Sequence, residues 1–308
     1  MISTAFHKIV LPLERNLFHE LFHSAEFEST GKGRLGNHLV KWDGQHIPVV
    51  RTTTRYTIPA TAFSGIHQSL VDHINKALSD EKKDIPSQDF NNALIEVYDA
   101  VYSKMGFHSD QALDLEDHSF IALFSCYEKP DELADFQLRK LVIKNKTTEE
   151  ESEIILHHNS VVLFSLETNK KFQHKIVLNS LPDPKIKADD NKWLGITFRK
   201  SKTYIRFNGT LPCFSTGELF KLADKEQESE FFQLRGRENR SLDFVYPDLS
   251  YTISQGDLLI PKHKSNFKIR KTLPEIEKYQ NANPLKTDSL NDFINKQNKL
   301  IEEIKILK

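Results

Sequence analysis

The chain has 308 residues, a formal net charge of −1 and a pI of about 6.9. Dedicated nucleic-acid-binding domains commonly have a pI above about 9, so any contact with nucleic acid here has to be local. No apolar run is long enough to cross a bilayer, and the N-terminus lacks the pattern of a signal peptide. Neither Cys126 nor Cys213 belongs to a CxxC pair. We therefore expect a cytoplasmic protein without disulfide bonds or membrane contact.

Residues 1–89 have a mixed pattern that predicts an N-terminal lid with supporting helices. ERNLFHELFHSAEF (14–27) predicts a short helix, and the β-branched stretch IPVVRTTTRYTIPA (47–60) predicts extended backbone. Apolar residues recur every four positions in 64–78, which predicts an amphipathic helix with Ser64 as its N-cap.

Residues 90–210 have a different pattern, in which short β-type runs recur between turn residues without a long helical segment. The runs are ALIEVY, SFIALFSCY, RKLVIKN, SVVLFSL, HKIVLN, WLGITFR and TYIRFN. Many short strands at regular spacing are typical of an antiparallel sandwich or jelly roll. Together with the helices before and after them, these strands predict an α+β fold with a jelly-roll core.

Residues 211–308 are predicted to form a mixed, partly helical C-terminal extension. The stretch 215–234 reads as a helix and 243–253 as extended backbone, while an apolar stripe from Thr287 onward predicts a final amphipathic helix. No motif in this part of the chain indicates its role, and nothing in the sequence indicates an oligomeric state.

Two histidine pairs are weak candidates for metal sites. HELFH (19–23) has the HExxH spacing, with Glu20 as the base, but a further ligand at the spacing of a zinc hydrolase does not follow. His157 and His158 are adjacent, so their side chains diverge on a strand and cannot readily share one ion. An ordinary amphipathic helix and a turn explain these pairs better.

His108 and Asp110 form a stronger candidate. On extended backbone, positions i and i+2 project to the same side, so both side chains can reach one ion. His174 at a predicted strand would complete a face of two histidines and one carboxylate, the usual arrangement of non-haem Fe(II) oxygenases. Such an enzyme also needs a cation for a 2-oxo acid, and the guanidinium of Arg199 matches a carboxylate with two donors.

The order and the flanks of these motifs resemble the AlkB-like family of Fe(II)/2-oxoglutarate dioxygenases. The similar segments are FNNALIEVYDAVYSKMGFHSD, SFIALFSCY, LHHNSVVLFSLETNKKFQHKIVL and WLGITFRKSKTYIRF, which span residues 90–205 in the family's order. The resemblance implies a double-stranded β-helix core, Fe(II) as the metal, and 2-oxoglutarate and O2 as co-substrates. It implies that His108, Asp110 and His174 bind the metal, that Tyr98 contacts 2-oxoglutarate, and that Arg199 pairs with one of its carboxylates.

Three departures from the family's pattern bear on the co-substrate and the substrate. Glu96 replaces an asparagine and places a carboxylate near an anionic co-substrate. Trp193 stands at the first arginine of the closing motif, so Lys202 or Arg206 is expected to supply the missing cation. Ala112 replaces an acid that nucleobase-repairing members often have, which weakens the case for damaged bases as substrates.

The substrate is open between alternatives. In the first, the protein demethylates single-stranded nucleic acid, held by Arg51, Arg55 and Tyr56 of the lid segment and by the basic cluster at 262–271. In the second, which the neutral pI favours, it hydroxylates a small molecule or a protein side chain. In the third, the departures from the family's pattern make it a catalytically silent binding module.

Overall fold

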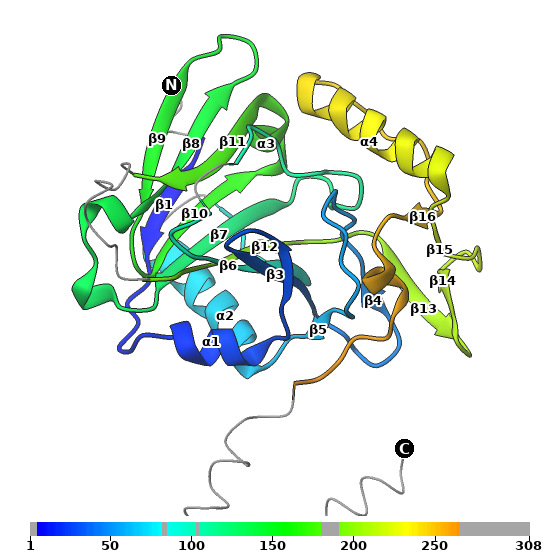
Figure 1. Ribbon diagram of the computed structural model, residues 1–308, viewed down its shortest axis with the longest axis horizontal. Helices are drawn as coiled ribbons and strands as arrows, with labels where there is room; N and C mark the ends of the chain where they lie inside the picture. Colours follow the sequence, from blue (N-terminus) through cyan, green and yellow to red (C-terminus); the bar gives the residue numbers. More distant parts are fainter. Residues whose placement is uncertain (1–4, 82–84, 103–104, 180–190, 265–308) are drawn as a thin grey trace, which may run out of the picture. The chain divides into compact units, whose positions relative to one another are not determined.

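A large, mainly antiparallel sheet is the centre of the fold (Figure 1). The computed structural model describes residues 5–81, 85–102, 105–179 and 191–264, which lie within one compact unit. The strands of the large sheet, in spatial order, are β1 (His7–Val10), β10 (Ser160–Ser165), β7 (Phe120–Tyr127), β12 (Trp193–Arg199), β6 (Asn92–Tyr98), β3 (Arg34–Val40) and β2 (Glu28–Gly31), with β5 (Thr61–Ala62) paired to β3.

A smaller antiparallel sheet packs against one face of the large sheet. Its strands are β11 (Phe172–Leu178), β8 (Arg139–Asn145) and β9 (Glu151–Leu156). Ile121 and Leu123 of the large sheet share a buried cluster with Leu141 and Ile143 of the small sheet. The predicted α+β class is confirmed, and two sheets packed in this way are consistent with the double-stranded β-helix that the sequence implies.

Two helices, α1 (Phe18–Ser24) and α2 (Gly65–Asp80), cover the other face of the large sheet (Figure 1). The helix predicted at 64–78 is confirmed as α2, with Ser64 at its N-cap and its apolar stripe buried. The first helix, predicted within 14–27, is shorter at both ends, and Asn16 accepts a hydrogen bond from the Phe18 amide at its start. Side chains on one face of the large sheet therefore pack against the small sheet, and side chains on its other face pack against α1 and α2.

The seven β-type runs of residues 90–210 all form strands, the last being β13 (Tyr204–Asn208). The strands β3 and β9 were not predicted. RLGNHLV contains glycine and asparagine, which have low β propensity, and ESEIIL alternates charged with apolar residues over a short length. Both are strands because they pair with the more strongly β-forming neighbours β6 and β8.

The C-terminal extension begins with small sheets and continues into a helix. One sheet consists of β14 (Leu211–Phe214), β13 and β4 (Ile47–Pro48), and the other of β15 (Lys221–Leu222) and β16 (Tyr251–Thr252). The helix predicted at 215–234 is wrong in its bounds, because α4 spans Lys225–Arg240. Asp224 fixes its start by accepting hydrogen bonds from the Glu226 and Gln227 amides at 2.9 Å.

The remaining described helices are short. They are α3 (Leu166–Lys171), η2 (Pro130–Glu132), η3 (Asp135–Gln137) and η4 (Gln255–Leu258). No helix among the described residues is both long and apolar enough to cross a membrane. The helix predicted from Thr287, and residues 265–271 of the basic cluster, lie outside the described residues.

The first two predicted segments of the chain are joined by strand pairing. β3, from residues 1–89, pairs along its full length with β6, from residues 90–210. β4, also from residues 1–89, pairs with β13. The predicted boundaries at 89 and 210 stay predictions, and the pairing shows that the N-terminal segment contributes strands to the large sheet.

Candidate metal centre

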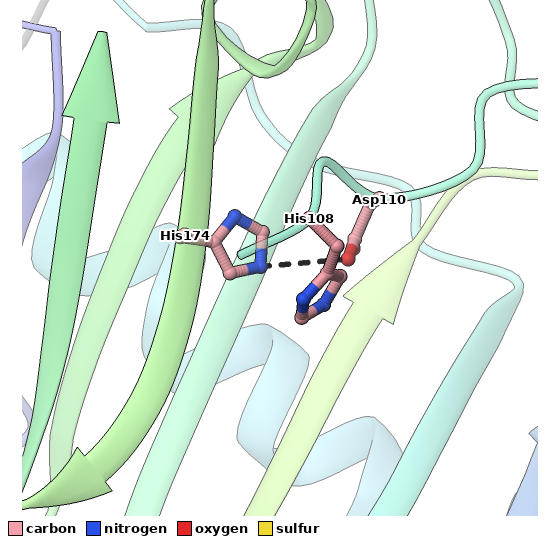
Figure 2. Close-up of side chains that lie close together, drawn as sticks. All are labelled: His108, Asp110 and His174. Carbon is pink, nitrogen blue, oxygen red and sulfur yellow. Dashed lines mark ion pairs between the residues drawn. The ribbon is translucent and has the colours of Figure 1, made fainter. Parts of the chain in front are cut away.

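His108, Asp110 and His174 converge at one end of the space between the two sheets (Figure 2). Each offers one ligand atom, and these atoms lie within 4.8 Å of one another. His174 Nε2 lies 3.6 Å from Asp110 Oδ1. In the part of the chain that the structure describes, no other group of three metal-ligating side chains meets this criterion. The triad predicted from the sequence is therefore a candidate metal centre.

A backbone bridge brings the two histidines together. His108 lies in the loop after β6, and His174 lies on β11. The His108 amide donates to the His174 carbonyl at 3.0 Å, and the His174 amide donates to the His108 carbonyl at 2.7 Å. The two residues are thus direct antiparallel partners, which places their rings 4.7 Å apart between centroids.

The third ligand is fixed by α3. Asn169 accepts a hydrogen bond from the Asp110 amide and donates one to the Asp110 carbonyl, both at 2.7 Å. Ser109 anchors the same loop by donating its hydroxyl to the Phe172 carbonyl at 2.9 Å. Because the backbone on both sides of the ligand is held, the position of the Asp110 carboxylate is restricted.

Helix α4 of the C-terminal extension also holds this loop. Asn239 Oδ1 accepts from the Ser109 amide at 2.8 Å, and Glu238 Oε1 accepts from the Ala112 amide at 2.8 Å. Arg235 donates to the Ser109 carbonyl. A role for the extension could not be inferred from the sequence, because these partners are more than a hundred residues from the loop.

The electrostatics of the triad favour metal binding. Burial opposes ionisation of Asp110, but the guanidinium of Arg199, at 2.9 Å from Nε and 2.8 Å from Nη2 to Asp110 Oδ2, holds the carboxyl pKa below its ordinary value. Burial, with the charge of His108 acting in the same direction, lowers the pKa of His174 to about 3. Burial also lowers the pKa of His108. Neutral imidazoles and an ionised carboxylate are the forms that bind a divalent metal.

A cavity of about 320 Å³ adjoins the triad. Arg199 lines it, and the Nη1 group of this arginine is buried without a hydrogen-bond partner among the described residues. The donor set is the one that non-haem Fe(II) prefers, and a carboxylate beside the metal would give Arg199 Nη1 its acceptor. The residues therefore fit Fe(II) and a chelating 2-oxo acid.

The predicted co-substrate residue Tyr98 lies under this cavity and does not line it. It is fully buried, and its hydroxyl donates to Glu96 Oε2 at 2.8 Å. Glu96 does line the cavity, so Tyr98 is connected to the site by its hydrogen bond to this carboxylate. A direct contact between Tyr98 and 2-oxoglutarate stays a prediction.

The two cations named as replacements for the missing arginine are elsewhere. Lys202 pairs with Asp117 at 3.6 Å, and Arg206 is exposed on β13; neither lines the cavity. Arg34 of β3 does line it, and was missed because no motif marks this strand. Trp193 itself, which stands where that arginine is missing, packs its indole over Gly195. A Cβ added at this glycine would lie 2.1 Å from the ring.

The lid segment contributes other residues than those predicted. Arg51 pairs with Asp114 at 2.7 Å, Arg55 contacts Glu228 of α4, and Tyr56 is buried against His38. The structure brings none of the three predicted side chains to the cavity wall, which is instead lined by Thr52, Thr53 and Thr54. A role for Arg51, Arg55 and Tyr56 in substrate binding stays a prediction. The contacts observed for them are with other residues of the protein.

Arg51 also joins the lid to the C-terminal extension. Its Nη1 donates to the carbonyls of Leu249 at 2.7 Å and Tyr251 at 3.0 Å, while its Nε and Nη2 donate to Asp114. All three nitrogens of the guanidinium are used inside the protein. The exposed surface of the lid therefore lacks this positive charge.

A pH dependence of stability is expected from Asp257, which lies near this ion pair. Burial, assisted by the charge of Asp114 and opposed by a hydrogen bond from Thr252, raises the Asp257 pKa to about 7. Because this value exceeds that of the unfolded chain, about 3.9, the folded state binds more protons between the two values and loses stability as pH rises. The melting temperature of Asp257→Asn, relative to wild type, should rise between about pH 4 and about pH 7. A constant difference would contradict the assigned pKa.

A family model matches the part of the sequence that contains this site. The family model described as the 2OG-Fe(II) oxygenase superfamily matches residues 15–199, and no curated protein sequence is significantly similar to the chain. The solved structure of OsALKBH1 has 13% identity and a TM-score of 0.44, covering 64% of this chain and 96% of its own. A prolyl-4-hydroxylase from Pseudomonas putida has 12% identity and a TM-score of 0.35, with coverages of 65% and 99%.

The family match settles the class of chemistry and confirms the resemblance seen in the sequence. It covers more than half of the chain and includes all three residues of the triad. Fe(II) and 2-oxoglutarate are the metal and the co-substrate that this family implies. The chain belongs to the 2OG-Fe(II) oxygenase superfamily, in which it is AlkB-like, and carries a candidate His108–Asp110–His174 facial triad.

Proposed function

We propose that the protein is an AlkB-like dioxygenase that oxidises a C–H bond or an N-methyl group and releases succinate and CO2. The observation that supports this most directly is the convergence of two histidines and one carboxylate, from separate segments of the chain, beside the buried Arg199. Departures at Glu96 and Trp193 leave these four residues intact. The catalytic alternative is therefore favoured over a silent binding module.

The chain's own residues would hold, orient and shield the reacting groups. His108, Asp110 and His174 would hold Fe(II), while Arg199 orients the carboxylate of Asp110 and offers Nη1 to a co-substrate carboxylate. When bound, the iron and 2-oxoglutarate supply the oxidising chemistry. Apolar side chains that keep water from the cavity are Met105, Leu123, Leu141, Phe164 and Ile176.

A small molecule or a protein side chain is the substrate that we propose. The cavity of about 320 Å³ is at the small end of the range for ligand sites, and 2-oxoglutarate would fill part of it. Arg51 and Arg55, the cations predicted to hold a nucleic-acid strand, are paired with Asp114 and Glu228. A net charge of −1 likewise does not favour a nucleic-acid strand as the partner.

Succinate formation tests the reaction. The protein is purified without oxygen, and Fe(II), 2-oxoglutarate and O2 are then supplied together and with each omitted in turn. We expect succinate only in the complete mixture, because a 2-oxo acid is decarboxylated only when metal and O2 are both present. Equal succinate with a strong chelator present, or none in the complete mixture, would contradict an oxygenase.

Substrate class is tested by mass spectrometry and by salt dependence. Small-molecule extracts, peptides and N-methylated single-stranded oligonucleotides are incubated with the active protein and searched for products one oxygen atom heavier or one CH2 unit lighter. We expect oxidation in the small-molecule or peptide samples. Demethylated oligonucleotides, with an affinity that falls steeply as salt rises, would instead support the nucleic-acid alternative.

A further inference from the structure

A cation for the far end of 2-oxoglutarate is the missing part of the site. We propose that Arg34 of β3 binds the distal carboxylate of the co-substrate, an inference that rests on the proposed function. Among the described residues, the arginines that line the cavity are Arg34, Arg199 and Arg235, and no lysine lines it. Arg199 is bound to Asp110, and Arg235 is bound to Glu238 and to the Ser109 carbonyl.

Arg34 is the most accessible of these guanidinium groups. Its side chain is 19% exposed, against 6% for Arg199 and 12% for Arg235. Nε and Nη2 donate to the same oxygen, Glu96 Oε1, at 2.7 and 2.5 Å. A guanidinium has five N–H donors in a rigid fork, so donors remain for a second carboxylate on the cavity side.

The position of Arg34 compensates for Trp193. Strand register places Arg34 opposite Tyr98 on β6, and Tyr98 opposite Trp193 on β12. Residues in register on neighbouring strands project from the same face of a sheet. Arg34 therefore lies in the row that contains Trp193, two strands away, and supplies the guanidinium that the closing motif lacks.

Glu96 is the obvious objection, because its negative charge lies close to the proposed anion. Both of its oxygens are occupied, Oε1 by Arg34 and Oε2 by the hydroxyl of Tyr98. A second guanidinium, that of Arg139, lies 5.0 Å from the centre of the Tyr98 ring.

Arg139 itself is buried and is held by backbone carbonyls. It is 2% exposed and donates to the backbone carbonyls of Tyr102 at 2.8 Å and Asp99 at 2.7 Å, while the Asp99 carboxylate accepts from amides of its own turn. The charge that directly balances Glu96 is therefore that of Arg34, and Glu96 in turn positions Arg34.

Binding of two 2-oxo acids tests the inference without relying on turnover. 2-Oxopentanoate has a methyl group in place of the distal carboxylate of 2-oxoglutarate and is otherwise matched to it. Equilibrium affinities for both are measured by calorimetry without oxygen, with Fe(II) present. Wild type should bind 2-oxoglutarate about 10- to 100-fold more tightly, the range expected of a charge-assisted hydrogen-bonded pair.

The decisive variant is Arg34→Gln combined with Glu96→Gln, which keeps the site electrically balanced. It should bind both 2-oxo acids with similar affinity, the loss falling on 2-oxoglutarate alone. Arg34→Lys keeps the charge without the fork and should lose part of the preference, which provides a test if the double variant does not fold. The matched control is Arg206→Gln, an exposed arginine on β13 that should keep the full preference.

The outcomes separate this inference from the proposed function. A wild type that prefers 2-oxoglutarate, with the preference lost in the Arg34 variants and kept in Arg206→Gln, supports both. A preference that survives in the Arg34 variants, or is absent in wild type, overturns the role of Arg34 and leaves the oxygenase in place. A wild type that binds neither 2-oxo acid in the presence of Fe(II) overturns the proposed function itself.

Discussion

Replacing His174 by alanine is expected to abolish specific Fe(II) binding and to reduce succinate formation by more than ~100-fold. Loss of a partner that only supports a metal ligand commonly costs ~10- to 100-fold, and loss of a ligand should cost more. His174 supplies one of three ligand atoms that lie within 4.8 Å of one another. The part of the chain that the structure describes contains no other such group. Fe(II) titration without oxygen and the succinate assay measure the two effects.

The matched control for this experiment is His19→Ala. His19 belongs to the HExxH sequence on α1, where Glu20 pairs with Arg15 and the His23 ring is hydrogen-bonded to the His19 carbonyl at 2.6 Å. We expect this variant to bind Fe(II) and form succinate as wild type does. Normal metal binding by His174→Ala, or its loss in His19→Ala, would remove the assignment of the metal centre.

The second large effect is expected from the buried ion pair of Arg51 and Asp114. Their side chains are 4% and 0% exposed, and Asp114 accepts hydrogen bonds from both the guanidinium and the amide of Arg51. Asp114→Asn should lower the free energy of unfolding by ~3–5 kcal/mol, because it leaves a buried guanidinium without its counter-charge. Urea unfolding followed by circular dichroism measures the change.

A surface ion pair provides the comparison. Lys170 and Glu167 are 38% and 51% exposed and lie within α3. Glu167→Gln should change the free energy of unfolding by less than ~1 kcal/mol, since solvent screens an exposed pair. If Asp114→Asn cost no more than this control, the lid and the C-terminal extension would not depend on the Arg51 contacts for their attachment.

Local features of the sequence predicted the strands and the triad. The runs that form β6, β7, β10 and β12 are apolar and rich in residues with high β propensity. This pattern is enough to predict a strand without knowing which strands pair with it. His108 and Asp110 could be paired by spacing alone, since extended backbone sends both to one side. His174 was added to this pair because it stands at a predicted strand, and the family's order of motifs agrees with that choice.

Contacts over long distances in the chain could not be predicted in this way. Arg34 and Glu96 are 62 positions apart, and Arg51 meets the carbonyl of Leu249 across 198 positions. Arg51 looked like a surface cation because arginines in extended polar segments commonly are, and only the buried position of Asp114 changes that reading. Such pairings depend on how the sheets are assembled, which no local pattern contains.

The hydrogen bonds between α4 and the loop after His108 determine where the chain can be truncated. The family match ends at residue 199, yet Asn239 and Glu238 accept from the amides of Ser109 and Ala112. A fragment ending at the family boundary would retain every metal ligand while exposing those amides to solvent. We therefore expect the smallest working enzyme to extend at least through Arg240, and changes in this C-terminal part to alter the candidate iron site without touching a proposed iron ligand.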